Sequence, residues 1–211
     1  NNSYETQPIS VNQPFVPKLN QINGIKRVEV FATKPGMIKT DDSMHGIVFK
    51  GVDKNYNWDF YQKNLVEGNL PQLNDTARVN EILLSQQVAQ LLKIKLNDIV
   101  LLYFLNEMET LPRILQLKVC GIYRTSLEEF DNIFILGDLK QIQRLNDWDE
   151  NEISGFEITI SDFRKIEEIE QEVRTLVLNY REDNETILRT INIARLYPQI
   201  FDWLSVIDMN V

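Results

Sequence analysis

The side chains most able to carry chemistry are few in this chain, and their spacing argues against an active site. His45 is the single histidine and Cys120 the single cysteine. Zinc sites and His-dependent nucleophiles need several such groups together, so the sequence excludes Cys-based zinc sites and an internal disulfide framework. We interpret His45, beside Gly46 at the start of a strand, as an ordinary polar residue. Cys120, inside an apolar strand, is interpreted as a core residue.

The acidic residues Glu128, Glu129 and Asp131 form a short cluster. Paired carboxylates can hydrolyse glycosides, but such pairs are more often solvated in a loop. The glycines are scattered, with neither a Gly-x-Gly nor a P-loop pattern to hold a phosphate. We therefore expect no catalytic residue, no cofactor site and no metal site.

Composition narrows the possible partners. The 211 residues carry 22 basic and 31 acidic side chains, a formal charge of −9, and 43% are hydrophobic. This is ordinary globular composition, and the acidic balance argues against a nucleic-acid partner. No apolar run approaches the roughly 20 residues of a membrane helix. The chain begins at Asn1 and stops just after an apolar, aromatic stretch, so we expect it to be a piece of a longer protein.

The acidic excess is concentrated in residues 147–185, which hold 13 acidic and four basic residues. Within this region, residues 162–176 have helical apolar spacing at Phe163, Ile166, Ile169, Val173 and Leu176. The pattern predicts a helix with one buried stripe and acidic residues facing water. A solvated helix face is the simpler interpretation, and the alternative is an acidic docking surface or a spacer repelled by anionic lipid.

Residue patterns predict an alternation of strands and helices. Ser85 is a predicted N-cap, and Asp138 is another, with Gln141 at the capping-box position. Residues 34–36 (Lys-Pro-Gly) are predicted to form a turn. The predicted strands are 26–32, 45–52, 81–84, 99–104, 115–123, 132–136, 155–160 and 186–191, and the predicted helices are 18–22, 86–93, one after Asp138, 162–176 and 194–207.

The chain shows a β-α-β pattern at its start and another at its end. Together they predict an α+β fold, a split ferredoxin-like sandwich interrupted by an insertion that contains a hairpin of strands 99–104 and 115–123. The predicted subdomains are 1–52 with 151–195, and the inserted mixed α/β subdomain 53–150. Residues 196–211 would form a helix that leads to a membrane segment, since Trp and Tyr suit a membrane interface. Packing of this helix on its own domain is equally compatible with its spacing.

Several segments resemble one family of membrane proteins. They are 46–52 (GIVFKGV), 81–85 (EILLS) with Leu91-Leu92 and Asn97-Asp98, 119–123 (VCGIY) continuing through Glu129 to Asp131, and 197–204 (YPQIFDWL). In order and spacing, the chain resembles the extracytoplasmic domain of an FtsX-like ABC transporter permease of the lipoprotein-releasing type, related to the MacB-like macrolide exporters.

The resemblance implies a permease with four membrane helices in a bacterial inner membrane, with this domain in the periplasm between the first and second helices. It implies a membrane-proximal (Porter-like) and an outer (Sabre-like) subdomain, without chemistry of their own. A separate cytoplasmic ATPase subunit would hydrolyse ATP, and a second permease subunit would complete a homo- or heterodimer. The domain would transmit ATP-driven motion for lipoprotein release, and a periplasmic lipoprotein carrier or adaptor would dock on it.

The resemblance also indicates a docking loop at residues 105–114. Its candidate partner-binding residues are Met108, Leu111, Pro112 and Arg113, and a plain hairpin connection is the alternative. The loop is shorter than that of carrier-binding permeases, and Ser126 replaces a common glycine. Hinges are expected where the chain passes between subdomains, with Asp53, Ser154 and Gly155 as candidates.

Two other classes of function stay open. An extracytoplasmic ligand-sensing domain would show a pocket with convergent polar groups. A carboxylate-dependent hydrolase would need two acids on facing strands at a cleft. A MacB-like exporter domain that docks an adaptor is a further alternative within the transporter class.

Overall fold

The structure is a computed structural model that describes residues 4–40, 42–106, 109–125, 127–180 and 188–196. The chain divides into two compact units. Unit 1 comprises Asn1–Val11 and Glu29–Phe156, and unit 2 comprises Asn12–Val28 and Glu157–Val211. The chain thus passes from one unit to the other after Val11, after Val28 and after Phe156.

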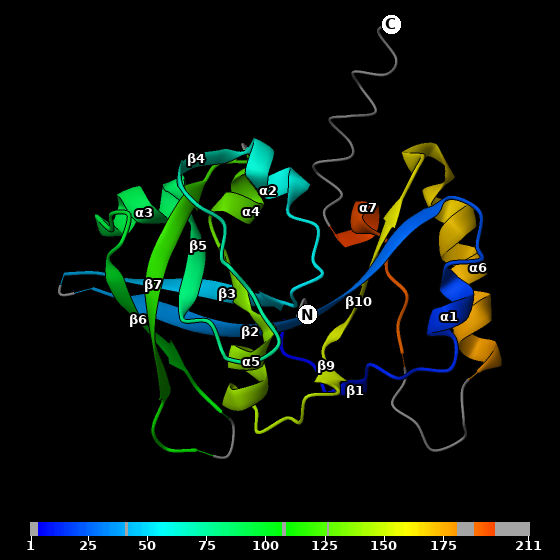
Figure 1. Cartoon of the computed structure of the whole chain (residues 1–211), viewed down its shortest axis with the longest axis horizontal. Helices are drawn as coiled ribbons and strands as arrows, with labels where there is room; N and C mark the ends of the chain where they lie inside the picture. The colour runs from blue at the N-terminus through cyan, green and yellow to red at the C-terminus, as the bar shows by residue number, and fades with distance from the viewer. Residues whose placement is uncertain (1–3, 41, 107–108, 126, 181–187, 197–211) are drawn as a thin grey trace, which may run out of the picture. The chain divides into compact units, whose positions relative to one another are not determined.

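Strands dominate unit 1, and the longest helix among the described residues lies in unit 2 (Figure 1). The strands are β1 (Ile9–Ser10), β2 (Ile25–Lys39), β3 (Met44–Val52), β4 (Leu65–Gly68), β5 (Glu81–Ser85), β6 (Ile99–Phe104), β7 (Arg113–Tyr123), β8 (Phe134–Asp138), β9 (Glu152–Ile153) and β10 (Gly155–Ile160). The helices are α1 (Val16–Leu19), α2 (Asp59–Lys63), α3 (Gln86–Leu92), α4 (Glu128–Asp131), α5 (Leu139–Leu145), α6 (Ile166–Asn179) and α7 (Ile193–Leu196), and Phe163–Lys165 form a 3₁₀ turn.

Six strands of the described chain pair in a closed ring. Strands β2, β3, β8, β5, β7 and β6 pair in that order, and β6 also pairs with β2. The β3–β8 and β5–β7 pairs are parallel and the others antiparallel. Strand β10 pairs with β2, and β4 pairs with β7. The hairpin of β6 and β7 was expected from sequence, and it is confirmed.

This ring joins segments that the sequence analysis assigned to different subdomains. Strands β2 and β3 belong to the predicted split subdomain, whereas β5 to β8 belong to the predicted insertion 53–150. Hydrogen bonding of β3 to β8 and of β2 to β6 places all of them in one sheet. The two compact units accordingly divide the chain at other positions than the predicted subdomains 1–52, 53–150 and 151–195.

The main core cluster of unit 1 is apolar, because alternate residues of the ring strands point into it. Phe49, Leu102 and Phe104 are fully buried in it. Helix α5 packs on β3, where Ile142 is buried beside Gly51. A second cluster contains Tyr61, Leu83, Tyr123 and Leu136.

Strand β2 runs through the segment that was predicted to turn, so that prediction is wrong. Pro35 lies opposite Val48, whose N–H donates to the carbonyl oxygen of Ile133. The Pro35–Val48 pair therefore makes no ladder hydrogen bond, and the missing N–H of Pro35 removes nothing from the β2–β3 ladder. At Gly36 an added Cβ would lie 2.6 Å from the ring of Phe104. Glycine is therefore required here because the ring packs against the strand, and no turn is formed.

Both predicted helix caps are confirmed. The Ser85 hydroxyl accepts a hydrogen bond from the Val88 N–H, and a carboxylate oxygen of Asp138 accepts one from the Lys140 N–H. The predicted capping box is wrong, because Gln141 donates instead to the Val79 carbonyl oxygen and to Asn80 Oδ1. The Gln141 side chain therefore bonds to residues distant in sequence and not to the backbone at the start of its own helix.

In unit 2, α6 has the predicted stripe in part. Ile169 and Val173 are buried, whereas Phe163 is exposed and the acidic Glu170 is buried. Leu19 at the end of α1 is also buried, and α1 packs on α6. Gly24 has a φ of +99°, and an added Cβ there would lie 2.9 Å from Ile169.

The α+β class is confirmed, but the split ferredoxin-like detail is not. Residues 188–191 of the predicted strand 186–191 are not in a strand, and 186–187 lie outside the described residues. Of the predicted C-terminal helix, the structure describes only α7, and residues 197–211 lie outside it.

Candidate functional site

The predicted docking loop connects β6 to β7 within unit 1. In this loop Leu111 is 76% exposed, and Pro112 is half-buried beside it. Met108 lies outside the described residues. The loop thus presents at least one large apolar side chain to solvent.

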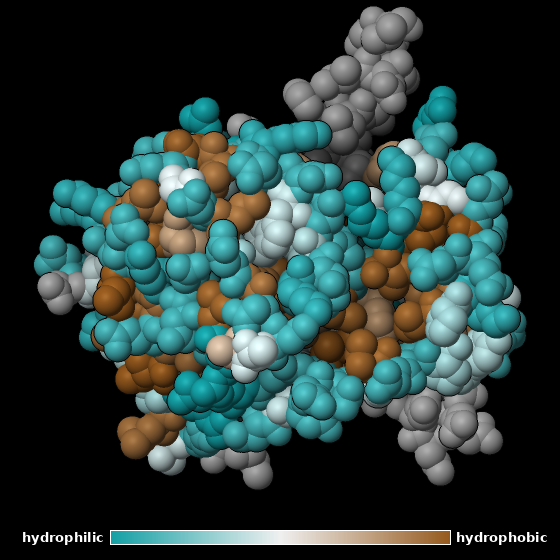
Figure 2. Space-filling view, in the orientation of Figure 1, coloured by the Kyte–Doolittle hydropathy of each residue, from teal (hydrophilic) through white to brown (hydrophobic). Residues whose placement is uncertain are grey.

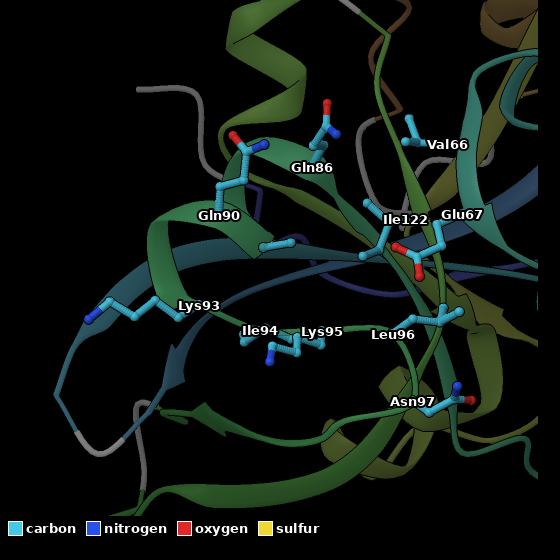
Figure 3. Close-up of a pocket in the computed structure, with 11 residues that line it drawn as sticks. Val66, Glu67, Gln86, Gln90, Lys93, Ile94, Lys95, Leu96, Asn97 and Ile122 are labelled. Carbon is cyan, nitrogen blue, oxygen red and sulfur yellow. The ribbon is translucent and has the colours of Figure 1, made fainter.

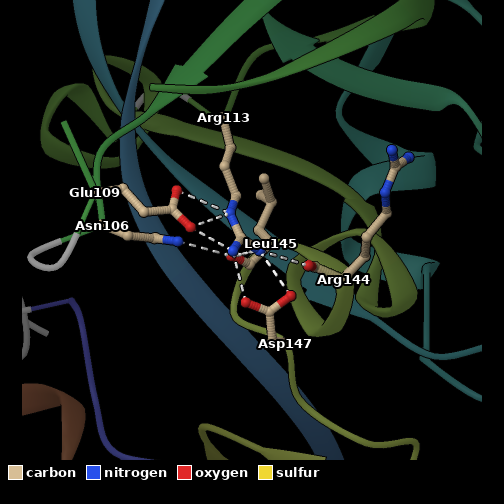
Figure 4. Close-up of polar contacts among 6 residues, drawn as sticks. All are labelled: Asn106, Glu109, Arg113, Arg144, Leu145 and Asp147. Atoms are coloured by element: carbon tan, nitrogen blue, oxygen red, sulfur yellow. Dashed lines mark hydrogen bonds and ion pairs between the residues drawn. The ribbon is translucent and has the colours of Figure 1, made fainter. Parts of the chain in front are cut away.

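Arg113 has a structural partner set, shown in Figure 4, where its guanidinium lies between Glu109 and Asp147. Its Nη2 lies 2.5 Å from Glu109 Oε1 and 2.6 Å from Asp147 Oδ2. Its Nη1 donates to the carbonyl oxygens of Arg144 and Leu145 at 3.2 and 3.0 Å. We call these residues the Arg113 clasp, because they tie the loop to the end of α5.

The clasp changes the acidity of its members. Hydrogen bonding from Arg113 holds the pKa of the Glu109 carboxyl below its usual value, and it does the same for Asp147. Hydrogen bonding to Asp147 raises the pKa of Arg113 further above its usual range. The side chains are thus held in their charged forms around the loop.

One face of the β6–β7 hairpin is apolar and exposed, which the sequence analysis did not predict. Ile99 is 63% and Ile114 51% exposed, and Leu101 and Leu105 are exposed as well. We call these residues, together with the exposed Leu111 of the connecting loop, the hairpin face. Figure 2 shows hydrophobic surface over this part of the molecule, at the lower left of the view.

The alternation of polar and apolar residues in 115–119 was a signal in the sequence for one exposed side of the hairpin, but the register decides which β6 residues share that side. Gln116 and Lys118 alternate with buried residues on β7, so their side of the hairpin faces solvent. In the register of the pair, Leu101 lies opposite Gln116 and Ile99 opposite Lys118. Apolar residues on β6 that face polar partners across the ladder must share their exposure. The apolar run 99–104 instead favoured a strand buried on both sides.

The three candidate hinge residues lie inside unit 1. The Ser154 hydroxyl accepts a hydrogen bond from the Thr33 N–H at 3.0 Å. Gly155 lies just before the passage of the chain at Phe156, and an added Cβ there would lie 3.2 Å from the ring of Phe31. Asp53 forms a local turn with Asn55. Their role as hinges stays a prediction.

The other candidate chemical groups are engaged in structure. His45 Nε2 lies 2.6 Å from the carbonyl oxygen of Asn132, and Cys120 donates its S–H to the carbonyl oxygen of Ile82. Burial raises the pKa of the Cys120 thiol to about 12. In the acidic cluster, Asp131 accepts hydrogen bonds from Thr125. Across the described residues, no three His, Cys, Asp or Glu side chains are grouped to hold a metal ion.

A hollow of about 660 Å³ lies beside α3 in unit 1 (Figure 3). Apolar residues such as Val66, Ile94 and Ile122 line it, together with Glu67 and Lys93. In Figure 3 the Lys93 side chain extends away from Glu67. Glu67 and Lys93 therefore do not converge on a single point as charged groups do in a site built for a small polar ligand.

Comparison with known proteins identifies the fold. No protein-family model matches the sequence, and no curated protein matches it either. Among solved structures, the chain is similar to the extracellular domain of the noncanonic ABC-type transporter YknZ from Gram-positive bacteria, with a TM-score of 0.53 and 16% identity over 82% of this chain and 84% of that one. It is also similar to the periplasmic region of MacB from Actinobacillus actinomycetemcomitans, with a TM-score of 0.50 and 14% identity over 80% and 76% of the two chains.

The chain has the fold of these two domains. The resemblance to extracytoplasmic domains of ABC transporter permeases is thereby confirmed at the level of fold. In the part of the chain that the structure describes, none of the helices is long and apolar enough to cross a bilayer.

Proposed function

We propose that this chain is the extracytoplasmic domain of an ABC transporter permease, on the periplasmic side of a bacterial inner membrane. Flanking membrane helices would connect it to the bilayer. The observation that carries the proposal is the fold shared with the YknZ and MacB domains over most of the chain. The order of motifs that resembles FtsX-like permeases supports it independently.

In this proposal the domain performs no bond chemistry. A separate cytoplasmic ATPase subunit hydrolyses ATP, and a second permease subunit, like or unlike, completes the transporter. The domain transmits the resulting motion. Its division into two compact units, between which the chain passes repeatedly, supports movement by hinge or shear.

The hairpin face is the proposed docking surface for a periplasmic partner. Exposed apolar residues grouped on one face mark interaction sites more often than isolated ones do. Arg113 would contribute indirectly, because it is engaged in the clasp that fixes the loop. The partner would be a lipoprotein carrier in lipoprotein release, or an adaptor if the protein is a MacB-like exporter.

The hollow beside α3 is the observation that favours a second candidate, an extracytoplasmic ligand-sensing domain. Its volume of about 660 Å³ lies within the range of small-molecule sites. Its Glu67 and Lys93 do not converge, however, and the shared fold gives this candidate no support. The transporter role is therefore preferred.

The proposal is tested on the complete permease, purified from membranes in three forms: unchanged, Leu111→Asp and Leu91→Asp. Leu91 is the matched control, because it is 55% exposed on α3 of the same unit. We expect an ATP-binding-cassette ATPase to co-purify with all three forms, because it would bind on the cytoplasmic side.

Binding of periplasmic partners is then measured by titration with a purified lipoprotein carrier and a purified adaptor. A charge on the hairpin face should weaken binding of one of them by at least about tenfold, since it would place a desolvated carboxylate in an apolar contact. Leu91→Asp should bind as the unchanged protein does. Absence of a co-purifying ATPase would refute the transporter role, and equal affinity of all three forms would refute only the docking surface.

A further inference from the structure

Among the residues that the structure describes, the buried acidic and basic side chains are Lys34, Asp131, Asp138 and Glu170. A buried charge destabilises a fold unless partners compensate it, so the partners indicate what each charge holds in place. Asp131 accepts a hydrogen bond from the Thr125 hydroxyl, and Asp138 accepts one from the Lys140 N–H at the start of α5. Both contacts lie inside unit 1. Lys34 and Glu170 instead hold segments near the two ends of the described chain.

Lys34 anchors the N-terminal segment to unit 1. This lysine on β2 is 1% exposed, and its Nζ lies 2.7 Å from Glu5 Oε1. The neighbouring Thr33 hydroxyl donates to the Tyr4 carbonyl oxygen at 2.7 Å. Further along the same segment, Ile9 in β1 pairs with β9. Residues 4–10 are thus fixed to unit 1 by an ion pair, a hydrogen bond and a short ladder.

Glu170 anchors the C-terminal segment to unit 2. It is 6% exposed on α6, and both of its carboxylate oxygens are used. Oε2 accepts a hydrogen bond from Asn192 Nδ2 at 2.6 Å, and Oε1 lies 3.3 Å from Arg195 Nη1. Arg174 also pairs with Oε1, one turn along α6. Asn192 Oδ1 in turn accepts a hydrogen bond from the Arg195 N–H. Because Asn192 and Arg195 both contact Glu170, the start of α7 is fixed to α6.

The two ends of the described chain are therefore held by different units. Residues 4–10 belong to unit 1 and residues 188–196 to unit 2. Each anchor consists of a buried charge with a partner of opposite charge, which resists displacement more than apolar contact alone because separation leaves an unpaired charge.

We propose that Lys34 and Glu170 are positioning residues through which movement of the two flanks is delivered to separate units. This inference rests on the proposed function, in which the flanks are membrane helices. Movement of one flank against the other would then act on unit 1 through Lys34 and on unit 2 through Glu170. The chain passages at Val11, Val28 and Phe156 would deform between them.

The test uses the complete permease with its ATPase and two spin labels, one in each unit. The labels replace exposed Leu91 on α3 and Leu178 on α6, each by Cys, in a Cys120→Ser background that keeps a donor to Ile82. The distance between labels is measured by pulsed electron resonance with and without ATP. Hydrogen exchange of peptides 4–11 and 188–196 is measured in the same preparations.

The variants are Glu5→Gln and Glu170→Gln, which remove the charge of one partner. Asp75→Asn is the control, because it removes an exposed ion pair with Lys54 far from both ends in sequence. Glu5→Asp and Glu170→Asp are the conservative variants. We expect each Gln variant to accelerate exchange of its own terminal peptide by at least about tenfold, since a charge-assisted hydrogen bond is lost.

The ATP-dependent change in label distance should be present in the unchanged protein and in Asp75→Asn, lost in both Gln variants, and restored in part by the Asp variants. The Gln variants could accelerate hydrogen exchange of their terminal peptides and still show the ATP-dependent change in label distance. That result would refute the inference, while the proposed function would stand. Unchanged exchange in the Gln variants would refute it as well. If the unchanged protein retains its ATPase but the label distance does not change with ATP, the inference is refuted and the proposed function stands. If no ATPase co-purifies, the proposed function fails, and this inference falls with it.

Discussion

At the residue scale, the most informative side chain is Arg113. Its sequence position beside Leu111 and Pro112 favoured a role in partner contact. The structure shows it paired with Glu109 and Asp147 and bonded to two backbone carbonyls. A single arginine with several planar donors can serve all these acceptors at once, which lysine cannot. Arg113 therefore positions the loop, and the exposed leucines are the better candidates for contact.

The Arg113 clasp predicts a pH dependence. The pKa values of Glu109 and Asp147 are lowered from 4.5 and 3.8. A lowered carboxyl pKa stabilises the folded loop above the ordinary value, and that contribution is lost as pH falls through the lowered pKa. We expect the clasp to be intact at neutral pH and to open only in acid below about pH 4.

Carboxyl carbon shifts measured by NMR during an acid titration check this prediction. Both midpoints should lie below the ordinary values in the unchanged chain. In Arg113→Met they should return towards 4.5 and 3.8. Midpoints at the ordinary values in the unchanged chain would contradict the clasp in solution.

At the element scale, the long strand β2 connects several other strands of unit 1. It pairs with β3 along most of its length and with β6 at its end. Pro35 and Gly36 in its middle are typical turn residues, and local preference alone would break the strand there. The ring of Phe104 fills the space that the missing side chain of Gly36 leaves open. Packing between distant strands thus overrides the local preference.

Two glycines of the same hairpin provide a matched pair for testing this packing. An added Cβ at Gly36 would lie 2.6 Å from Phe104 and 2.9 Å from the Tyr103 carbonyl oxygen, whereas Gly46 on β3 has nothing within 4 Å. We expect Gly36→Ala to lower the free energy of unfolding by about 1–3 kcal/mol. Gly46→Ala should leave it unchanged or raise it slightly, because alanine loses less backbone entropy on folding.

Urea unfolding of both variants, followed by circular dichroism, measures the difference. Equal stabilities of Gly36→Ala and Gly46→Ala would show that the Phe104 ring moves aside without cost. That result would contradict the close approach of β2 and β6 at this point.

At the scale of the whole molecule, the two compact units have separate buried residues. The large core cluster, with Ile142 at the contact of α5 and β3, lies in unit 1, whereas Ile169 and Val173 lie in unit 2. Cavities made in one core destabilise the residues that pack around them. Units with separate cores can open independently.

We therefore expect Ile142→Ala to destabilise unit 1 by about 2–5 kcal/mol and to accelerate hydrogen exchange there. Exchange in α6 should stay as it is in the unchanged protein. Val173 is buried on α6. Val173→Ala should therefore accelerate hydrogen exchange in unit 2 and leave exchange in unit 1 as it is in the unchanged protein. Mass spectrometry of peptides from both units measures this, and equal acceleration in both units would show that the chain unfolds as one body.

The sequence by itself determined several local elements, the α+β class and the resemblance to transporter permease domains. Caps at Ser85 and Asp138, the β6–β7 hairpin and helix α6 depend on residues near one another in the chain, so their patterns are visible in it. Composition likewise narrowed the chemistry that could be expected, since single copies of His and Cys leave few combinations.

Only the tertiary structure decided the pairing of β3 with β8, the closure of β6 on β2 and the burial of Lys34 and Glu170. These features depend on contacts between segments that are distant in the chain. The local sequence pattern of one segment does not specify which distant segment it will contact. An acidic residue on an acidic helix has the same local pattern whether it faces water or, like Glu170, an arginine and an asparagine more than 20 residues away. The partner decides, because a buried charge is tolerated only where an opposite charge or a donor meets it.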